Sequence, residues 1–81
     1  MNLTDFNTYS TKLRAEIVQV RGLLLAQRTL KEYRIKLFAV KCFFVEIWVL
    51  EADQKQVIEV SGFKNIICLE PYLNMIKLPS L

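Results

Sequence analysis

Two glutamates, Glu46 and Glu59, come nearest to forming an acid–base pair in this chain. They lie in neighbouring segments that are each typical of a β-strand, so strand pairing would bring their carboxylates onto one sheet face. General acid–base catalysis also needs a cleft and a raised pKa, and the sequence indicates neither. We therefore interpret both glutamates as ordinary sheet residues and expect no catalytic residue.

Metal and nucleophile chemistry are also disfavoured. The sequence has no histidine, and its two cysteines, Cys42 and Cys68, are far apart. Two thiolates cannot complete a tetrahedral zinc shell, and catalysis of the Ser-His-Asp or Cys-His type needs an imidazole. No glycine-rich turn follows a strand to hold a nucleotide. The sequence predicts a protein without metal or cofactor that is not an enzyme.

Cations and bulky aromatics alternate along the central part of the chain. On an open sheet such a mixture can hold phosphates and stack bases, as RNA-recognition sheets do. The two glutamates would repel phosphate there, so we expect a protein-interaction face, with its aromatics covered by the C-terminal segment or by a second copy. The predicted face comprises Arg34, Lys36, Phe38, Phe44, Glu46, Trp48, Leu50 and Val57.

The elements that position these residues follow from hydrophobic spacing. Residues 33–37 and 56–61 alternate between apolar and polar, and residues 43–50 are β-branched and aromatic, so all three segments predict strands. A turn centred near Lys41 pairs Lys36 with Glu46, Arg34 with Trp48, and Phe38 with Phe44. The next hairpin pairs Ile47 with Val60, Trp48 with Glu59, and Leu50 with Val57. The opposite face is then wholly apolar and collects Ile35, Leu37, Phe43, Val45, Ile47, Val49, Ile58 and Val60.

An amphipathic helix is predicted over residues 5–21, with Thr4 as its N-cap. Gly22 is expected to end it with a positive φ. Residues 23–30 could extend this helix or form a first strand, and the strand is favoured because glycine inside a helix costs about 1 kcal/mol. The apolar stripe of the helix consists of Phe6, Tyr9, Leu13, Ile17, Val20 and Leu24.

The expected fold is α+β in a single domain, residues 1–81. It has an N-terminal helix, an antiparallel meander of three or four strands between residues 23 and 63, and a short helical segment after residue 65. Hydrophobic residues make up 53% of the 81 positions, and the mean hydropathy is +0.26. So small a domain has little interior to hide them, which favours self-association.

A cytoplasmic location without membrane contact is expected. The most apolar run, residues 43–50, is too short to span a bilayer and contains Glu46. The first residues lack the features of a signal peptide. The net charge of +3 divides into +5 over residues 1–41 and −2 over residues 42–81. We interpret the basic half as solvated helix and strand faces.

The chain resembles a family of small uncharacterised bacterial proteins with a glycine-ended helix, a tyrosine-led strand, a strand like "FYVEV" and a closing "LEPYL". Here the matching segments are 33–38, 43–48 and 69–73, with Phe44 where tyrosine is usual. The resemblance implies the fold and no activity. A weaker similarity is to toxins of the RelE/ParE type, but Ser61 to Lys64 lack the basic and aromatic cluster of those nucleases. The topology is also similar to double-stranded-RNA-binding domains, without their C-terminal lysine cluster.

The functional prediction is a non-catalytic bacterial protein that acts through protein–protein contact, as a homodimer. The alternative is RNA binding, or a degenerate RelE/ParE-type nuclease that uses Arg34, Lys36 and nearby cations.

Overall fold

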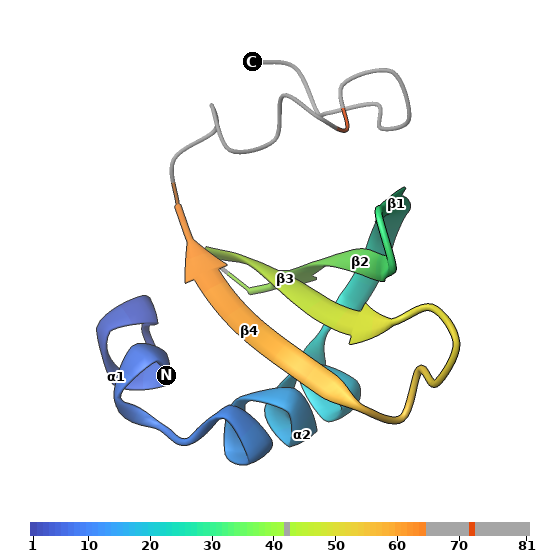
Figure 1. Cartoon of the computed structure of the whole chain (residues 1–81). Coiled ribbons are helices and arrows are strands. Elements are labelled where there is room, and N and C mark those ends of the chain that lie inside the picture. The colour runs from blue at the N-terminus through green and yellow to red at the C-terminus, as the bar shows by residue number, and fades with distance from the viewer. Residues whose placement is uncertain (42, 65–71, 73–81) are drawn as a thin grey trace.

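Four strands that follow one another in the chain form one antiparallel sheet, and two short helices cover one of its faces (Figure 1). The computed structural model describes residues 1–41, 43–64 and 72. The strands are β1 (Leu23–Leu30), β2 (Tyr33–Val40), β3 (Phe43–Leu50) and β4 (Val57–Phe63), in that spatial order. The predicted α+β fold is confirmed, and residues 23–30 are a strand. The helical segment predicted after residue 65 lies outside the described residues.

The N-terminal helix is interrupted, so the prediction of one helix over residues 5–21 was wrong. α1 (Leu3–Thr8) ends before Ser10, whose extended backbone and hydroxyl begin α2 (Thr11–Arg21). The Ser10 Oγ accepts a hydrogen bond from the Leu13 N–H at 3.1 Å. Asn2, rather than the predicted Thr4, caps α1 by accepting from the Asp5 N–H at 2.8 Å. Short polar side chains that capture free backbone donors favour such helix starts.

Gly22 ends α2 as predicted, but its backbone is extended, with φ −85° and ψ 149°. The expected positive φ was therefore wrong. Close packing explains the glycine instead. A Cβ at this position would lie 2.5 Å from the carbonyl oxygen of Val18 and 3.2 Å from Cδ2 of Phe38. Gly22 is the single residue between the end of α2 and the start of β1, so no loop separates the two elements.

The β2–β3 hairpin is one residue away from the predicted register. Val40 lies opposite Phe43, which leaves a two-residue turn with Lys41 at φ 53°. Lys36 consequently lies opposite Ile47. Because side chains alternate between the faces of a sheet, this shift moves every β2 side chain to the other face relative to β3. The pairs that were wrong are Lys36 with Glu46, Arg34 with Trp48, and Phe38 with Phe44.

The β3–β4 pairing follows the predicted register from Phe44 to Trp48 and departs from it at Val49, next to the loop that joins the two strands. Two predicted pairs are confirmed, Ile47 with Val60 and Trp48 with Glu59. A β-bulge follows, because Ile58 is an extra residue on β4, and Val49 rather than Leu50 lies opposite Val57. The bulge turns Val57 toward the helices, where it packs against the core.

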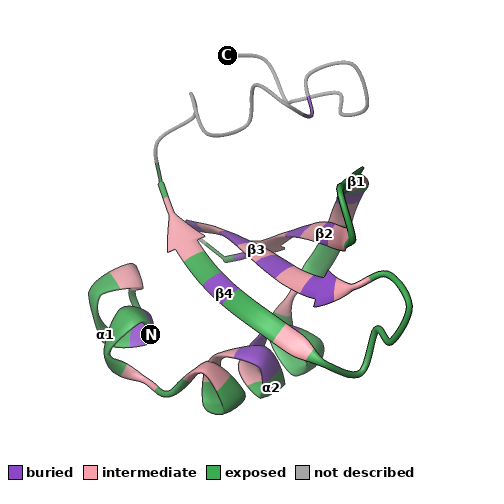
Figure 2. Ribbon diagram, in the orientation of Figure 1, coloured by how far each residue is buried: buried purple, intermediate pink, exposed green. Residues whose placement is uncertain are grey.

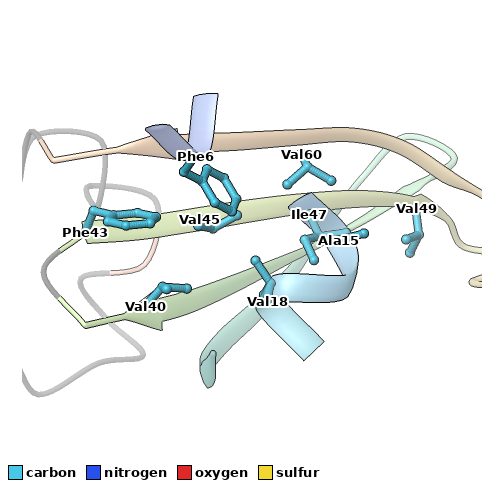
Figure 3. Packing of buried hydrophobic residues seen from close by; sticks show 9 residues of the cluster. All are labelled: Phe6, Ala15, Val18, Val40, Phe43, Val45, Ile47, Val49 and Val60. Carbon is cyan, nitrogen blue, oxygen red and sulfur yellow. The ribbon is translucent and has the colours of Figure 1, made fainter. Parts of the chain in front are cut away.

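Both faces of the sheet carry buried apolar residues. The helix face, which is the sheet face under α1 and α2, holds a core built from Phe6, Ala15, Val18, Val40, Phe43, Val45, Ile47, Val49 and Val60 (Figure 3). Along β3, buried and partly exposed residues alternate (Figure 2). Strand β2 buries Val40 on the helix face and two larger side chains on the other. Ile35 and Leu37 were predicted to join Val45 and Ile47, but they lie on the outer face, which is the face away from the helices.

Candidate interaction surfaces

The predicted interaction face is divided between the two sides of the sheet. The strand pairing leaves Phe44, Glu46, Trp48 and Leu50 on the outer face. The remaining four residues, Arg34, Lys36, Phe38 and Val57, lie on the helix face. Phe38 and Val57 pack against the helix-covered core. The mixed face predicted from the sequence therefore does not exist as one surface.

Arg34, near the start of β2, is held by an ion pair with Glu51. Its guanidinium donates to both carboxylate oxygens of Glu51, at 3.0–3.2 Å, and to Gln27 Oε1 at 3.1 Å. The hydrogen bonds from Arg34 lower the pKa of Glu51 from its usual value. Because this charge is already neutralised in a forked geometry, Arg34 is a poor anchor for phosphate.

A polar cluster that the sequence did not predict lies on the outer face. Arg28 on β1 donates to Glu46 Oε2 on β3 at 3.3 Å, and the Tyr72 hydroxyl donates to the same oxygen. Tyr72 is fully buried against Leu37 and Ala26. Burial and the bond to Glu46 raise the pKa of Tyr72 to about 12, although Arg28 opposes the shift. This cluster ties residue 72 to the sheet.

Glu46 and Glu59 share the outer face but have different partners. Glu46 lies opposite Leu37 and Ser61 in the sheet, and its carboxylate is engaged by Arg28 and Tyr72. Glu59 lies opposite Trp48. In residues 1–41, 43–64 and 72, no group of three acidic or cysteine side chains is placed to hold a metal ion. Nor, among the helices of this described part, is one long and apolar enough to cross a bilayer.

A shallow hollow lies beside Trp48 on the outer face. Tyr33, Trp48, Ile58 and Glu59 line this Trp48 hollow, whose volume is about 350 Å³. The Tyr33 and Trp48 rings are tilted by 58° with centroids 5.7 Å apart. Trp48 is half-buried. The predicted register did not place Tyr33 and Ile58 here: the one-residue shift of β2 brings Tyr33 to the outer face, and the bulge on β4 turns Ile58 out of the apolar face.

A larger groove runs along the outer side of α2. Its walls are mostly apolar, its volume is about 480 Å³, and it is lined by Met1, Tyr9, Leu13, Glu16, Ile17, Val20 and Arg21. Four residues of the apolar stripe predicted for the N-terminal helix line this groove, namely Tyr9, Leu13, Ile17 and Val20. Val20 is 83% exposed and Leu13 41% exposed, whereas Ala15 and Val18 make the buried face of α2. We call this surface the α2 groove.

The stripe was misplaced because α2 has two apolar faces. The wider apolar face, which contains Leu13, Ile17 and Val20, follows helical spacing, and this spacing predicted that it would face the core. Ala15 and Val18 face the sheet instead and are buried in the helix-face core. Further exposed leucines follow on the edge strand β1, with Leu23 67% and Leu24 45% exposed.

Comparison of the chain with protein-family models, with curated proteins and with solved structures gave no match.

Proposed function

We propose that this chain is a non-catalytic cytoplasmic protein of bacterial origin that acts through protein–protein contact and self-associates as a homodimer. The observation that carries this proposal is the α2 groove. Leu13 and Val20 are exposed on a helix whose opposite face is already buried, and within the described residues neither belongs to the helix-face core, although Ile17 between them packs partly against it. Contiguous apolar surface of this kind is typical of interaction sites.

The occupant we propose for the α2 groove is the same groove of a second copy. Leu13, Ile17 and Val20 recur at spacings of four and three, which is the d-a-d pattern of a coiled-coil seam. Glu16 precedes the central a position and Arg21 follows the last d position. These are the g and e positions, which lie five residues apart and form ion pairs between parallel helices. The stripe and its flanking charges are therefore self-complementary about a two-fold axis.

The seam is short, and this limits the strength of the contact. A standard stable interface buries about 800 Å² on each partner, and three layers of apolar side chains supply less than that. Tyr9 and Met1 extend the groove at its rim. We therefore expect a reversible dimer whose population depends on protein concentration.

The first prediction concerns the oligomeric state. The wild-type chain should sediment as a monomer–dimer equilibrium, and Val20→Glu should shift it to monomer because it places a carboxylate in the apolar seam. Trp48→Ala should leave the equilibrium unchanged, since Trp48 lies on the outer face. Sedimentation equilibrium at several concentrations measures both. A wild-type monomer at high micromolar concentration contradicts the proposed function. A Trp48→Ala monomer would return the contact to the outer face.

The second prediction concerns the flanking charges. Glu16→Arg and Arg21→Glu should each weaken the homodimer, because each replaces an ion pair with a like-charge pair. Mixing the two variants should restore association, since both interhelical pairs are then opposite in sign. Lys12→Glu, a charge reversal on α2 outside the groove lining, is the matched control. Failure of the mixture to associate, with a dimeric wild type, would reject parallel helix pairing while self-association stands.

The salt dependence of binding distinguishes homodimer formation from the alternative of RNA binding or a degenerate RelE/ParE-type nuclease. Phosphate contacts weaken steeply as salt concentration rises, whereas apolar association does not. The Arg34–Glu51 pairing argues against this alternative.

A further inference from the structure

Arg28 shows how the outer face binds a guanidinium group. Its Cζ lies over the Trp48 ring at 5.9 Å from the centroid and over the Tyr72 ring at 5.3 Å. The same guanidinium is 3.3 Å from a Glu46 carboxylate oxygen. Two aromatic rings and one carboxylate therefore surround one cation, a combination in which ring quadrupoles and the carboxylate charge act together.

The Trp48 hollow presents a second set of the same groups. Tyr33 and Trp48 supply two tilted rings, and Glu59 supplies a carboxylate. Trp48 is shared between the two sets. Arg28 comes from β1, across β2 from the tryptophan, whereas Glu59 lies opposite Trp48 on β4. Among the described residues, the side chains that line the hollow include no cation.

The strand pairing explains why these groups converge. Tyr33 lies opposite Leu50, so it is a diagonal neighbour of Trp48 across β2 and β3. The bulge on β4 turns Ile58 into the hollow beside Glu59, where it adds an apolar wall. A planar group can lie against such a wall and an aromatic ring while its edge reaches the carboxylate, and a guanidinium has that shape.

Two carboxylates adjoin the hollow, and the Arg28 guanidinium over the Trp48 ring is already paired with Glu46. The hydrogen bond and charge of Glu32 raise the pKa of the neighbouring Tyr33, so a second carboxylate lies beside the hollow. An anionic rim attracts cations and disfavours phosphate.

We infer that the Trp48 hollow binds an arginine side chain presented by a basic segment of a partner protein. The guanidinium lies on Trp48 and Tyr33 and donates hydrogen bonds to Glu59. This site is on the opposite side of the sheet from the α2 groove, so it is independent of the proposed dimer contact.

The chain has one tryptophan, which makes Trp48 a direct spectroscopic probe of the hollow. An acetyl-Gly-Arg-Gly-amide peptide should produce a saturable change in Trp48 fluorescence and shift its indole N–H signal in nuclear magnetic resonance spectra. The matched citrulline peptide keeps the shape and lacks the charge. It should bind about tenfold more weakly, since hydrogen bonds to charged groups are stronger than neutral ones.

Variants of the hollow assign the contacts. Glu59→Gln and Tyr33→Leu should each weaken binding of the arginine peptide several-fold, and added salt should weaken it further. Asp53→Asn removes one acidic charge from the loop before β4 and is the matched control, with binding unchanged. Absence of a saturable response, equal binding of the citrulline peptide, or unchanged affinity in Glu59→Gln would each overturn the inference.

Discussion

Tyr72 shows how one side chain can join distant parts of this chain. Its ring fills the space above Leu37 and Ala26, and its hydroxyl donates to Glu46, which also accepts from Arg28. No local sequence pattern marks this contact, because the partners lie on β1, β3 and a position outside the strands. Side-chain clusters of this kind follow only from the three-dimensional register.

The third prediction follows from the raised pKa of Tyr72. The unfolded phenol titrates near 10 and the folded one near 12, so the folded state holds this proton more tightly. The Tyr72 contribution to stability is therefore complete below pH 10 and is lost as pH rises toward 12. Tyr72→Phe should lower the free energy of unfolding at neutral pH by about 1–2 kcal/mol.

Urea unfolding at a series of pH values measures both effects. Tyr72→Phe should flatten the alkaline loss of stability, whereas Tyr9→Phe should retain it. An unchanged alkaline slope in Tyr72→Phe would assign the loss to other groups.

At the scale of elements, close packing around Gly22 determines how α2 ends and β1 begins. The fourth prediction is that Gly22→Ala destabilises the protein by about 1–3 kcal/mol, the range for overpacking a close contact. The added Cβ would meet a backbone oxygen of α2, which cannot move without disturbing the helix end. Gly62→Ala is the comparison. Its nearest neighbour is the terminal methyl of Leu3 at 2.7 Å, so its cost should be smaller. Thermal unfolding of both variants tests the order.

Element types were predictable from this sequence, but their faces were less so. Alternation and β-branched content identified the strands, and Gly22 marked the helix end. The β2–β3 register was missed because the turn has two residues, and Ile35 and Leu37 looked like partners of Val45 and Ile47. The predicted register would suit a sheet that buries large apolar residues on one face only. In fact, β2 buries large residues on the outer face and β3 on the helix face.

At the scale of the whole molecule, the surplus of apolar residues is divided among three places. Among the described residues, the helix face and the outer face each bury a share, and much of the remainder is exposed on α2 and at the start of β1. The sequence predicted that an unpartnered apolar surface would exist, but it placed that surface around Trp48. The candidate contact moved to α2 because Ala15 and Val18, rather than Leu13 and Val20, face the sheet.

The order of elements along the chain also sets the order in which they can fold. Each strand pairs with the next in sequence, so the meander can grow by local hairpins, which form within microseconds. The helices are made first, yet α1 packs against β4, where Leu3 and Phe6 lie beside Gly62. During synthesis from the N-terminus, Phe6 can therefore reach Phe43 on β3 before its neighbours on β4 have been made. The contacts of α1 and α2 with β4 can consequently form only after β4 has emerged, although both helices emerge first.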